Sequence, residues 1–459
     1  MASPHEILDG SALAMADALR AGTVTSQALV DAALERADAL NPTLNAWTHV
    51  HHRRARLWAW QADRARRRAP DRVPTLHGVP TGIKDLVPTR FAPTRFGSRS
   101  YRYFISPIRG EVARRMDRGG LISIGKLATS EFGVLPVTEP DIHPPTVTPW
   151  NTDYAAGGSS GGSGSAVAAG IVPFAHGSDG GGSIRIPAAL NHIFGFKPSL
   201  SLLGNLHGPV NRLGLSVMGP LSRTVRDAAA MLDVMAGMPA VGLHPDSCLA
   251  ACDTPAPKLR IGVLLHNPVA ETHPEIAAAV EQLATTLETL GHAVTPAPPI
   301  EGSLEAFLPI WKFAVGGVPA LNESVLRPVT QWLRRERKHI TFEQAEQARQ
   351  RLVGLIDASM ASFDVLLTPT IPCFGPRVGA LENATDPEAW FANAAPLGSF
   401  TAPFNLTHGA AASLPLGLGT NGLPMAAQLA VRPGQDHMLL SLCATVETMR
   451  PWAHLRPPV

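Results

Sequence analysis

Two glycine- and serine-rich segments in the first half of the chain constrain its fold more than any other feature. Residues 157–165 read Gly-Gly-Ser-Ser-Gly-Gly-Ser-Gly-Ser, and residues 177–185 read Gly-Ser-Asp-Gly-Gly-Gly-Ser-Ile-Arg. Glycine adopts backbone angles closed to other residues, so both segments predict turns whose backbone can approach a reacting atom. A serine in such a turn can act as a nucleophile, and neighbouring amides can bind a developing oxyanion. We therefore expect these turns to hold a catalytic site.

A lysine upstream of the turns is a candidate base. Lys84 lies in Gly-Ile-Lys-Asp, 75 residues before Ser159, and the chain has only six lysines against 33 arginines. A lysine that must lose its proton cannot be replaced by arginine, which stays protonated at ordinary pH. The apolar neighbours Ile83 and Leu86 favour the burial that lowers a lysine pKa. Taken alone, Lys84 would be interpreted as a surface residue paired with Asp85; its spacing to Ser159 favours the base.

These motifs resemble, in order and spacing, the amidase signature family. That family has a Gly-x-Lys-Asp turn, then Gly-Gly-Ser-Ser-Gly-Gly, then Gly-Ser-Asp-x-Gly-Gly-Ser-x-Arg. Further similar segments are residues 195–198, 219–227, 401–405 and 422–429. The resemblance runs from about residue 25 to about 445 and is weakest between about 240 and 390. It implies one α/β domain built on a twisted mixed sheet of about eleven strands, flanked by helices on both faces.

The resemblance also implies an activity and a catalytic triad. The activity is hydrolysis of carbon–nitrogen bonds through an acyl-enzyme, without a cofactor or metal ion. Ser183 is the expected nucleophile, and Ser159 is expected to pass a proton between Ser183 and Lys84. In the family the bridging serine follows a cis peptide bond, which here would join Gly158 to Ser159.

The second turn also supplies the expected oxyanion hole. Its donors would be the backbone amides of Gly180, Gly181, Gly182 and Ser183. Many family members have Thr where this chain has Gly180, a change that keeps the amide and alters the stiffness of the turn. Asp179 and Arg185 flank the nucleophile, and we interpret them as buried supports of the loop in preference to substrate contacts.

Three alternatives compete with this hypothesis. The Gly-x-Ser-x-Gly pattern around Ser160 also fits the nucleophile elbow of α/β-hydrolases, with His408 or His437 as a downstream base. Neither histidine lies in a convincing motif, and we interpret Ser160 as a supporting residue. Residues 157–165 could be an anion cradle before a helix, although no phosphate-loop pattern is present. The A-type subunits of glutamyl-tRNA amidotransferases share the motifs and work with a second protein.

The residues that follow the motif arginine favour a stand-alone enzyme. Amidotransferase subunits commonly carry Gln after the motif arginine, whereas residues 185–187 here read Arg-Ile-Pro. The segment is more similar to amidases acting on nylon oligomers, aryl amides and carbamates, which implies a hydrophobic amide, ester or carbamate substrate and includes urethanes. Trp311, Phe313 and Trp332 are candidates for the pocket or for helix packing. Cys373 is interpreted as a buried small hydrophobe that could lie near the pocket.

Composition narrows the cellular context. Hydrophobic residues at 45% and charged residues at 17% predict a globular protein, and a net charge of +2 gives no reason to expect a nucleic acid partner. The arginines of 53–68 are interpreted as a solvated helix face. Four scattered cysteines predict reduced thiols and no zinc site. No secretory signal is recognised, and the apolar stretch 166–175 is too short to span a bilayer, so we expect a cytoplasmic monomer or homodimer with no membrane partner.

The expected organisation is one domain over residues 1–459. Its parts are a helical segment (1–75), the catalytic core (76–230), a variable substrate-pocket region (240–390) and a return to the core (391–459), with a linker-like segment at 237–257. Periodicity predicts helices at 12–21, 25–40, 110–118, 163–169 and 274–290. Strands are predicted at 79–87, 119–124, 171–175, 259–265, 293–294 and 365–370.

Overall fold

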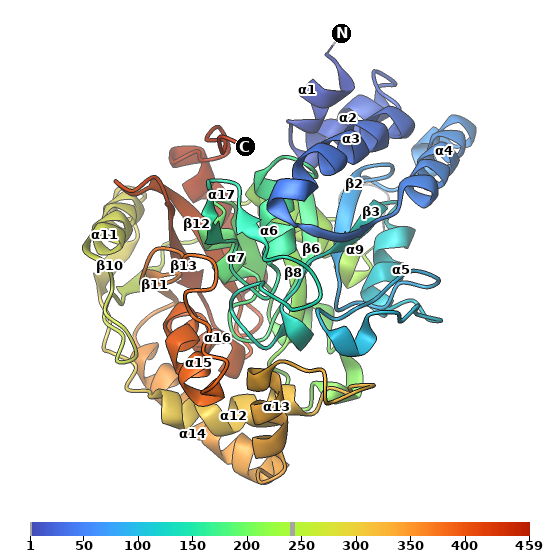
Figure 1. The fold of residues 1–459 in the computed structure, drawn as a ribbon. Coiled ribbons are helices and arrows are strands. Elements are labelled where there is room, and N and C mark those ends of the chain that lie inside the picture. The colour runs from blue at the N-terminus through green and yellow to red at the C-terminus, as the bar shows by residue number, and fades with distance from the viewer. Residues whose placement is uncertain (1, 239–243) are drawn as a thin grey trace.

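A mixed β-sheet runs through the whole molecule (Figure 1). The structure, a computed structural model, describes residues 2–238 and 244–459. Within these ranges eleven strands pair in the order β1-β3-β2-β6-β8-β7-β12-β13-β11-β9-β10. Their bounds are β1 (Trp47–Val50), β2 (Pro80–Lys84), β3 (Ile122–Leu127), β6 (Phe174–Asp179), β7 (Phe194–Lys197), β8 (Val217–Ser222), β9 (Arg260–Val263), β10 (Ala293–Pro296), β11 (Val365–Pro369), β12 (Ala411–Leu418) and β13 (Pro424–Ala430). A separate antiparallel pair is β4 (Val147–Thr148) and β5 (Asn151–Ala155).

Helices flank both faces of the sheet, as the sequence predicts for this α/β domain. The N-terminal helices are α1 (Pro4–Leu8), α2 (Ala12–Arg20), α3 (Ser26–Leu44) and α4 (His52–Arg68). The central helices are α5 (Glu111–Arg118), α6 (Gly161–Ala168), α7 (Arg185–Leu190), α8 (Leu200–Leu203), α9 (Val225–Ala236) and α10 (Cys248–Ala251). The remaining helices are α11 (Pro274–Thr289), α12 (Leu304–Gly316), α13 (Pro328–Arg337), α14 (Phe342–Ser359), α15 (Pro387–Ala394), α16 (Pro403–Leu406) and α17 (Asp436–Met449). In Figure 1, α12 to α15 gather at the lower end of the molecule. No helix of the described ranges is long and apolar enough to cross a bilayer.

The sheet brings Lys84 close to the glycine- and serine-rich turn that precedes Ser183. Strands β2 and β6 are parallel neighbours, with Gly82 opposite Ala175 and Ile83 opposite His176. Every residue of both strands is buried, as expected for strands covered on both faces. Parallel neighbours end at the same edge of a sheet, so Lys84 and the turn that follows β6 meet there.

Most predicted elements are present, and their boundaries differ by a few residues; the strand predicted at 79–87, for example, ends at Lys84. The strand predicted at 171–175 is wrong in its position, because Pro173 cannot donate to the ladder and β6 begins after it, at Phe174. The unit β9-α11-β10 is the predicted βαβ piece, with its strands parallel. Part of the linker predicted at 237–257 lies outside the described residues, and another part is helix α10, whose first amides are capped by Asp233.

Candidate active site

Lys84, the last residue of β2, is fully buried. Its Nζ lies 2.7 Å from Ser159 Oγ, and it donates to Ser178 Oγ at 3.0 Å and to the Ser178 carbonyl at 3.3 Å. Burial lowers the pKa of Lys84 to about 7, and the Asp179 carboxylate opposes this shift. A substantial fraction of this amine is therefore neutral near pH 7. The structure thus places two members of the expected triad in direct contact.

Ser159 is held by a loop packed tightly against the chain at 136–138. The peptide bond between Gly158 and Ser159 is cis. A side chain at Gly158 would meet the backbone nitrogen of Val137 at 2.6 Å, so only glycine permits this approach. Thr138 Oγ1 accepts a hydrogen bond from the Gly161 amide at the start of α6. This local packing fixes Ser159 beside Lys84.

Ser183 follows a turn that also demands glycine. Gly182 has a φ of 128°, and a Cβ there would lie 2.2 Å from Thr401 Oγ1. The Ser183 carbonyl accepts a hydrogen bond from the Ser160 amide at 3.2 Å, which joins the two serine turns. The Ser183 side chain remains 7% exposed and faces the cavity described below.

Asp179 and Arg185 form a fully buried ion pair behind this turn. Two guanidinium nitrogens of Arg185 donate to the two carboxylate oxygens of Asp179, each at 2.9 Å. Burial by itself would raise the pKa of Asp179, but Arg185, Lys197 and Asn405 outweigh it, so the pKa lies well below its ordinary value. The remaining Arg185 partners are the Thr401 carbonyl, Gln428 and Asn405.

This ion pair corrects one residue of the expected oxyanion hole. The Gly182 amide donates to Asp179 Oδ1 at 2.7 Å, so it is already engaged and does not point to a substrate. The carboxylate also accepts from the Ile184 amide at 3.1 Å. The expected donors then reduce to the amides of Gly180, Gly181 and Ser183.

Ser160 makes contacts unlike those of a nucleophile elbow. Its hydroxyl donates to the Ser178 carbonyl at 3.2 Å and accepts from the Ser178 amide at 3.3 Å. His408 bonds instead to the Leu213 carbonyl, and His437 lies exposed on α17. Within the described residues Ser160 has no histidine base, so the esterase alternative lacks its catalytic partner.

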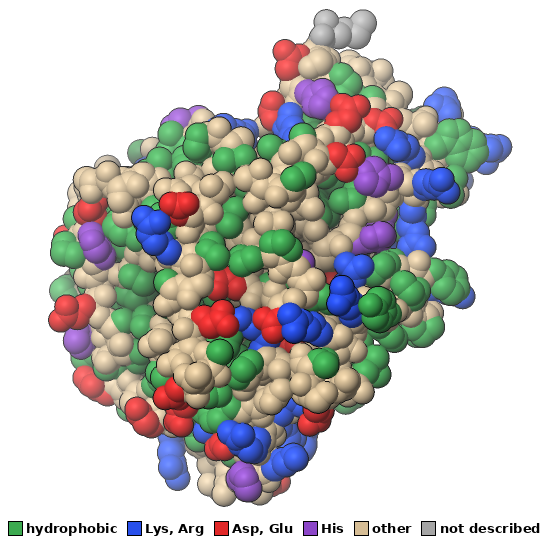
Figure 2. Space-filling view, in the orientation of Figure 1, with side chains coloured by type: hydrophobic (Ala, Val, Ile, Leu, Met, Phe, Trp, Pro, Cys, Tyr) green, Lys and Arg blue, Asp and Glu red, His purple; other side chains and the backbone are tan. Residues whose placement is uncertain are grey.

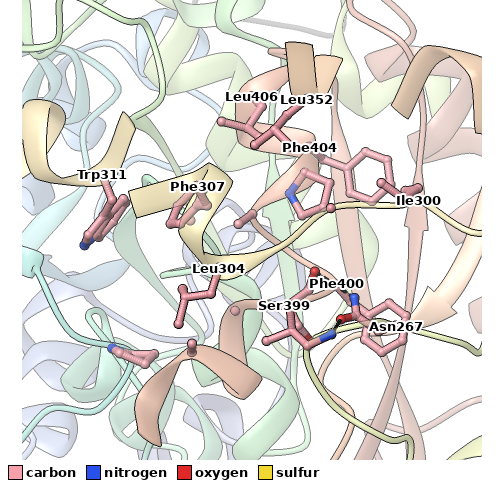
Figure 3. A pocket seen from close by; sticks show the side chains of 18 of the residues that line it. Asn267, Ile300, Leu304, Phe307, Trp311, Leu352, Ser399, Phe400, Phe404 and Leu406 are labelled. Carbon is pink, nitrogen blue, oxygen red and sulfur yellow. Dashed lines mark hydrogen bonds between the residues drawn. The ribbon is translucent and has the colours of Figure 1, made fainter. Parts of the chain in front are cut away.

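A cavity of about 140 Å³ opens beside Ser183 and Gly181. Figure 3 shows Leu304, Phe307 and Trp311 of α12 along it, with Ile300, Phe400 and Phe404 contributing further apolar surface. Phe307 and Trp311 stack with their ring centroids 5.7 Å apart. The polar side chains of the lining are His266, Asn267, Ser303, Thr368, Ser399 and Ser183 itself. Among the lining residues that the structure describes there is no Asp, Glu, Lys or Arg.

Comparison with known proteins decides the family. The model of the Amidase family matches residues 28–440. The chain belongs to this family. It is 35% identical to "Putative amidase AmiC" of Mycobacterium tuberculosis, with 98% of this chain and 96% of the relative covered. A "Putative amidase" of Synechocystis is 32% identical over 95% of this chain and 88% of that relative.

Solved structures of amidases show the same fold. A 6-aminohexanoate cyclic dimer hydrolase superposes with a TM-score of 0.86 at 29% identity, covering 98% of this chain and 99% of the other. A bacterial aryl acylamidase superposes with a TM-score of 0.84 at 25% identity, covering 97% of each chain. This protein is therefore an amidase, a hydrolase of carbon–nitrogen bonds, with the predicted single-domain α/β fold.

The pocket of the amidase was only partly visible in its sequence. Trp311 lines the cavity, whereas Phe313 and Trp332 belong to buried clusters beside it. Cys373 is partly buried against one of these clusters and does not line the cavity. Residues 133–136 and 391–406 also contribute to the wall, although the sequence placed both in the core. Their apolar composition carries no signal that separates a pocket wall from a core.

The role of Arg185 in supporting the loop before Ser183 can be tested by removing its ion pair with Asp179. We expect Arg185→Met to lower the free energy of unfolding by about 3–5 kcal/mol, because it leaves the Asp179 carboxylate buried and unpaired. The matched control is Arg260→Met, which removes the exposed pair with Asp364 and should leave the free energy of unfolding nearly unchanged. Urea unfolding measures both variants. Equal effects would contradict the assigned role of Arg185.

Proposed function

We propose that this amidase is a serine amidohydrolase that uses Ser183, Ser159 and Lys84 on uncharged, apolar amides or carbamates. Neutral Lys84 accepts the proton of Ser159, which accepts the proton of Ser183 as its oxygen attacks the carbonyl carbon. Ser159 then returns a proton to the departing nitrogen, which leaves on Ser183 an acyl-enzyme from an amide or an alkoxycarbonyl-enzyme from a carbamate. Water attacks this intermediate by the reverse proton transfers and releases a carboxylic acid from an amide substrate, or a monoester of carbonic acid from a carbamate substrate.

The contacts of Lys84 support the direction of proton transfer. A neutral amine has two hydrogens and one lone pair. The two hydrogens have acceptors in the hydroxyl and the carbonyl of Ser178, at 3.0 and 3.3 Å. The lone pair is then left to accept from Ser159 Oγ at 2.7 Å. This arrangement suits a base that receives the Ser159 proton.

The backbone amides of Gly180, Gly181 and Ser183 are the proposed oxyanion donors. The turn is held from behind by Asp179 and from the side by Thr401, whose hydroxyl donates to the Gly181 carbonyl at 2.7 Å. Donors fixed before the reaction stabilise developing charge without reorganising.

The lining of the cavity is the observation that carries the proposed substrate class. A charged substrate group buried there would need an opposite charge or several hydrogen bonds. The described lining offers no Asp, Glu, Lys or Arg, and aromatic and aliphatic groups dominate it. Aryl amides and carbamates, including urethanes, fit such a wall. The names of the two similar solved structures, a cyclic dimer hydrolase and an aryl acylamidase, agree with this class.

The same lining argues against glutamine as substrate. The α-carboxylate and α-ammonium groups of free glutamine would find no Asp, Glu, Lys or Arg in the described lining of this cavity. The likeness to a glutamyl-tRNA(Gln) amidotransferase chain from Thermotoga maritima, with a TM-score of 0.74 at 23% identity, shows a common fold alone. We therefore favour a stand-alone hydrolase over a component of an amidotransferase.

A substrate panel tests the proposal. The purified single chain should hydrolyse acetanilide, a 4-nitroanilide and a dicarbamate of an aromatic diamine, with esters cleaved faster than amides because alkoxide needs less protonation. The reaction should proceed in the presence of a chelator and without ATP, tRNA or a second protein. Free glutamine should be a poor substrate. Activity only on glutamine, and only with ATP and a second protein, would contradict the stand-alone assignment.

A further inference from the structure

One side of the molecule carries an unusual concentration of exposed apolar and arginine side chains. Six of the fourteen large hydrophobic side chains exposed in the described residues lie between residues 57 and 108. They belong to helix α4 and to the loop of residues 89–109, and Figure 2 shows green and blue side chains gathered over this side. We define this arginine–apolar face by Leu57, Trp60, Phe91, Tyr103, Ile105, Ile108 and the exposed Arg53, Arg64, Arg67, Arg68, Arg90, Arg99 and Arg102.

The loop presents its apolar side chains from a structured base. Backbone hydrogen bonds join Phe91 to Ser106, Ser106 to Ala92 and Thr94 to Phe104, so the loop folds back on itself as a hairpin. Phe96 and Tyr101, in the turn of this hairpin, pack against the buried cluster beside the pocket. Other side chains of the hairpin remain in solvent, with Tyr103 86% exposed and Phe91 65% exposed.

Helix α4 and the loop form one continuous surface. Arg54 on α4 donates to the backbone carbonyls of Arg90 and Phe91. The guanidinium groups of Arg54 and Arg109 both lie 5.5 Å from the ring centroid of Trp58, one from the helix and the other from the loop. The exposed side chains of both elements therefore share one face.

The face carries an excess of positive charge, although two arginines beside it, Arg56 and Arg109, pair with Asp31 and Asp117. Residues 52–68 and 89–109 contain twelve arginines and one acidic residue, Asp63. Asp63 is buried and accepts hydrogen bonds from the Ser26 and Gln27 amides. None of the seven exposed arginines that define the face forms an ion pair with a described residue. Their charges remain available to an anionic partner.

We propose that this face docks the amidase on the surface of an anionic lipid bilayer. Arginines beside tryptophan, tyrosine and aliphatic tips match the composition of segments that lie in a bilayer interface, where guanidinium groups meet lipid phosphates and apolar tips enter the acyl boundary. Isoleucine and leucine tips offer nothing to a nucleic acid, whose bases stack on aromatic planes. The aliphatic tips Leu57, Ile105 and Ile108 thus favour lipid over nucleic acid.

The sequence alone does not predict this face, because the face combines two separate segments of the chain. The arginines of 53–68 alone suggest a solvated helix, and the loop is 20 or more residues away in sequence. The contacts of Arg54 and Arg109 hold the loop of residues 89–109 against α4, and they thereby place the exposed arginines and apolar side chains of the loop beside those of the helix. The expectation of no membrane partner rested on the absence of a spanning segment, which does not bear on docking at a surface.

Co-sedimentation with vesicles tests the proposal. The purified chain should pellet with vesicles of phosphatidylcholine and phosphatidylglycerol at low salt, pellet weakly with phosphatidylcholine alone, and be released by high salt. Arg90→Gln/Arg102→Gln should lower the partition coefficient by about 25-fold, and Ile105→Ser/Ile108→Ser by about tenfold. The matched controls Arg335→Gln/Arg351→Gln and Leu355→Ser/Leu418→Ser change exposed residues elsewhere and should leave the partition coefficient unchanged.

Control experiments on the same variants test whether each variant is folded and whether the face binds another partner. Each variant should retain hydrolysis of a soluble ester, which shows that it is folded. No binding of the wild-type chain to the anionic vesicles at low salt, or equal losses in face variants and controls, would overturn the proposal. Duplex DNA that binds through the arginines and displaces the vesicles, without dependence on the isoleucines, would assign the face to nucleic acid. A dimer that Ile105→Ser/Ile108→Ser converts to a monomer would assign it to self-association.

Discussion

Ser183→Ala should lower kcat/KM for an aryl amide by on the order of 10⁴-fold or more and abolish covalent labelling by a fluorophosphonate. The reason is that the proposed reaction has no other route to an acyl-enzyme, because Ser183 both faces the cavity and ends the turn that is proposed to bind the oxyanion. The variant should remain folded, since the Ser183 hydroxyl makes no hydrogen bond to a described residue. Labelling followed by peptide mapping, together with steady-state kinetics, measures both effects.

Ser160→Ala is the matched control for this experiment. Its hydroxyl hydrogen-bonds to the Ser178 backbone, so its loss should reduce stability and activity modestly and leave fluorophosphonate labelling of Ser183 intact. Labelling that maps to Ser160, or a Ser183→Ala variant that still turns over at a substantial rate, would contradict the nucleophile assignment.

The sequence identified the parts of the site that depend on local backbone geometry. Gly158 and Gly182 are required by close approaches that glycine alone permits, so their motifs are recognisable in the sequence itself. The pairing of Lys84 with Ser159 was predicted from the order and spacing of the family motifs, and Lys84 Nζ lies 2.7 Å from Ser159 Oγ in the structure. The alternation of strands and helices likewise predicted an α/β domain.

The sequence could not predict contacts between segments that are far apart in the chain. The wall of the cavity joins residues 133–136, α12 and residues 391–406, and each of these is an ordinary apolar segment. The Gly182 amide was expected to bind the oxyanion, but it donates a hydrogen bond to Asp179. The sequence does not show that the Asp179 side chain folds back over its own loop to accept this bond. The order of the eleven strands was similarly hidden, because distant strands such as β7 and β12 pair across long connections.

Lys84 provides a pH-dependent test of the proton path. Burial lowers the pKa of Lys84 to about 7, so the neutral amine accumulates as the pH rises through this value. We expect kcat/KM to rise with pH and to fall about tenfold for each pH unit below the apparent pKa, which belongs to the coupled Ser–Ser–Lys unit. Folding stability should respond with the same sign. The penalty for burying the ammonium is fully present below about pH 7 and disappears as the pH rises towards 10.5, the ordinary pKa of a lysine side chain.

Lys84→Arg should therefore be nearly as damaging as Lys84→Ala, with each lowering kcat/KM by about 10²–10⁴-fold at neutral pH. Arginine keeps the positive charge, but it cannot become a neutral base and cannot accept the proton of Ser159. The matched control Lys258→Arg alters an exposed lysine that donates to the Leu290 carbonyl, and it should leave both the rate and the pH profile unchanged. Kinetics across the pH range, with circular dichroism to confirm folding, measure the three variants. Substantial activity of Lys84→Arg with the wild-type pH profile would show that the proton leaves Ser159 by another path.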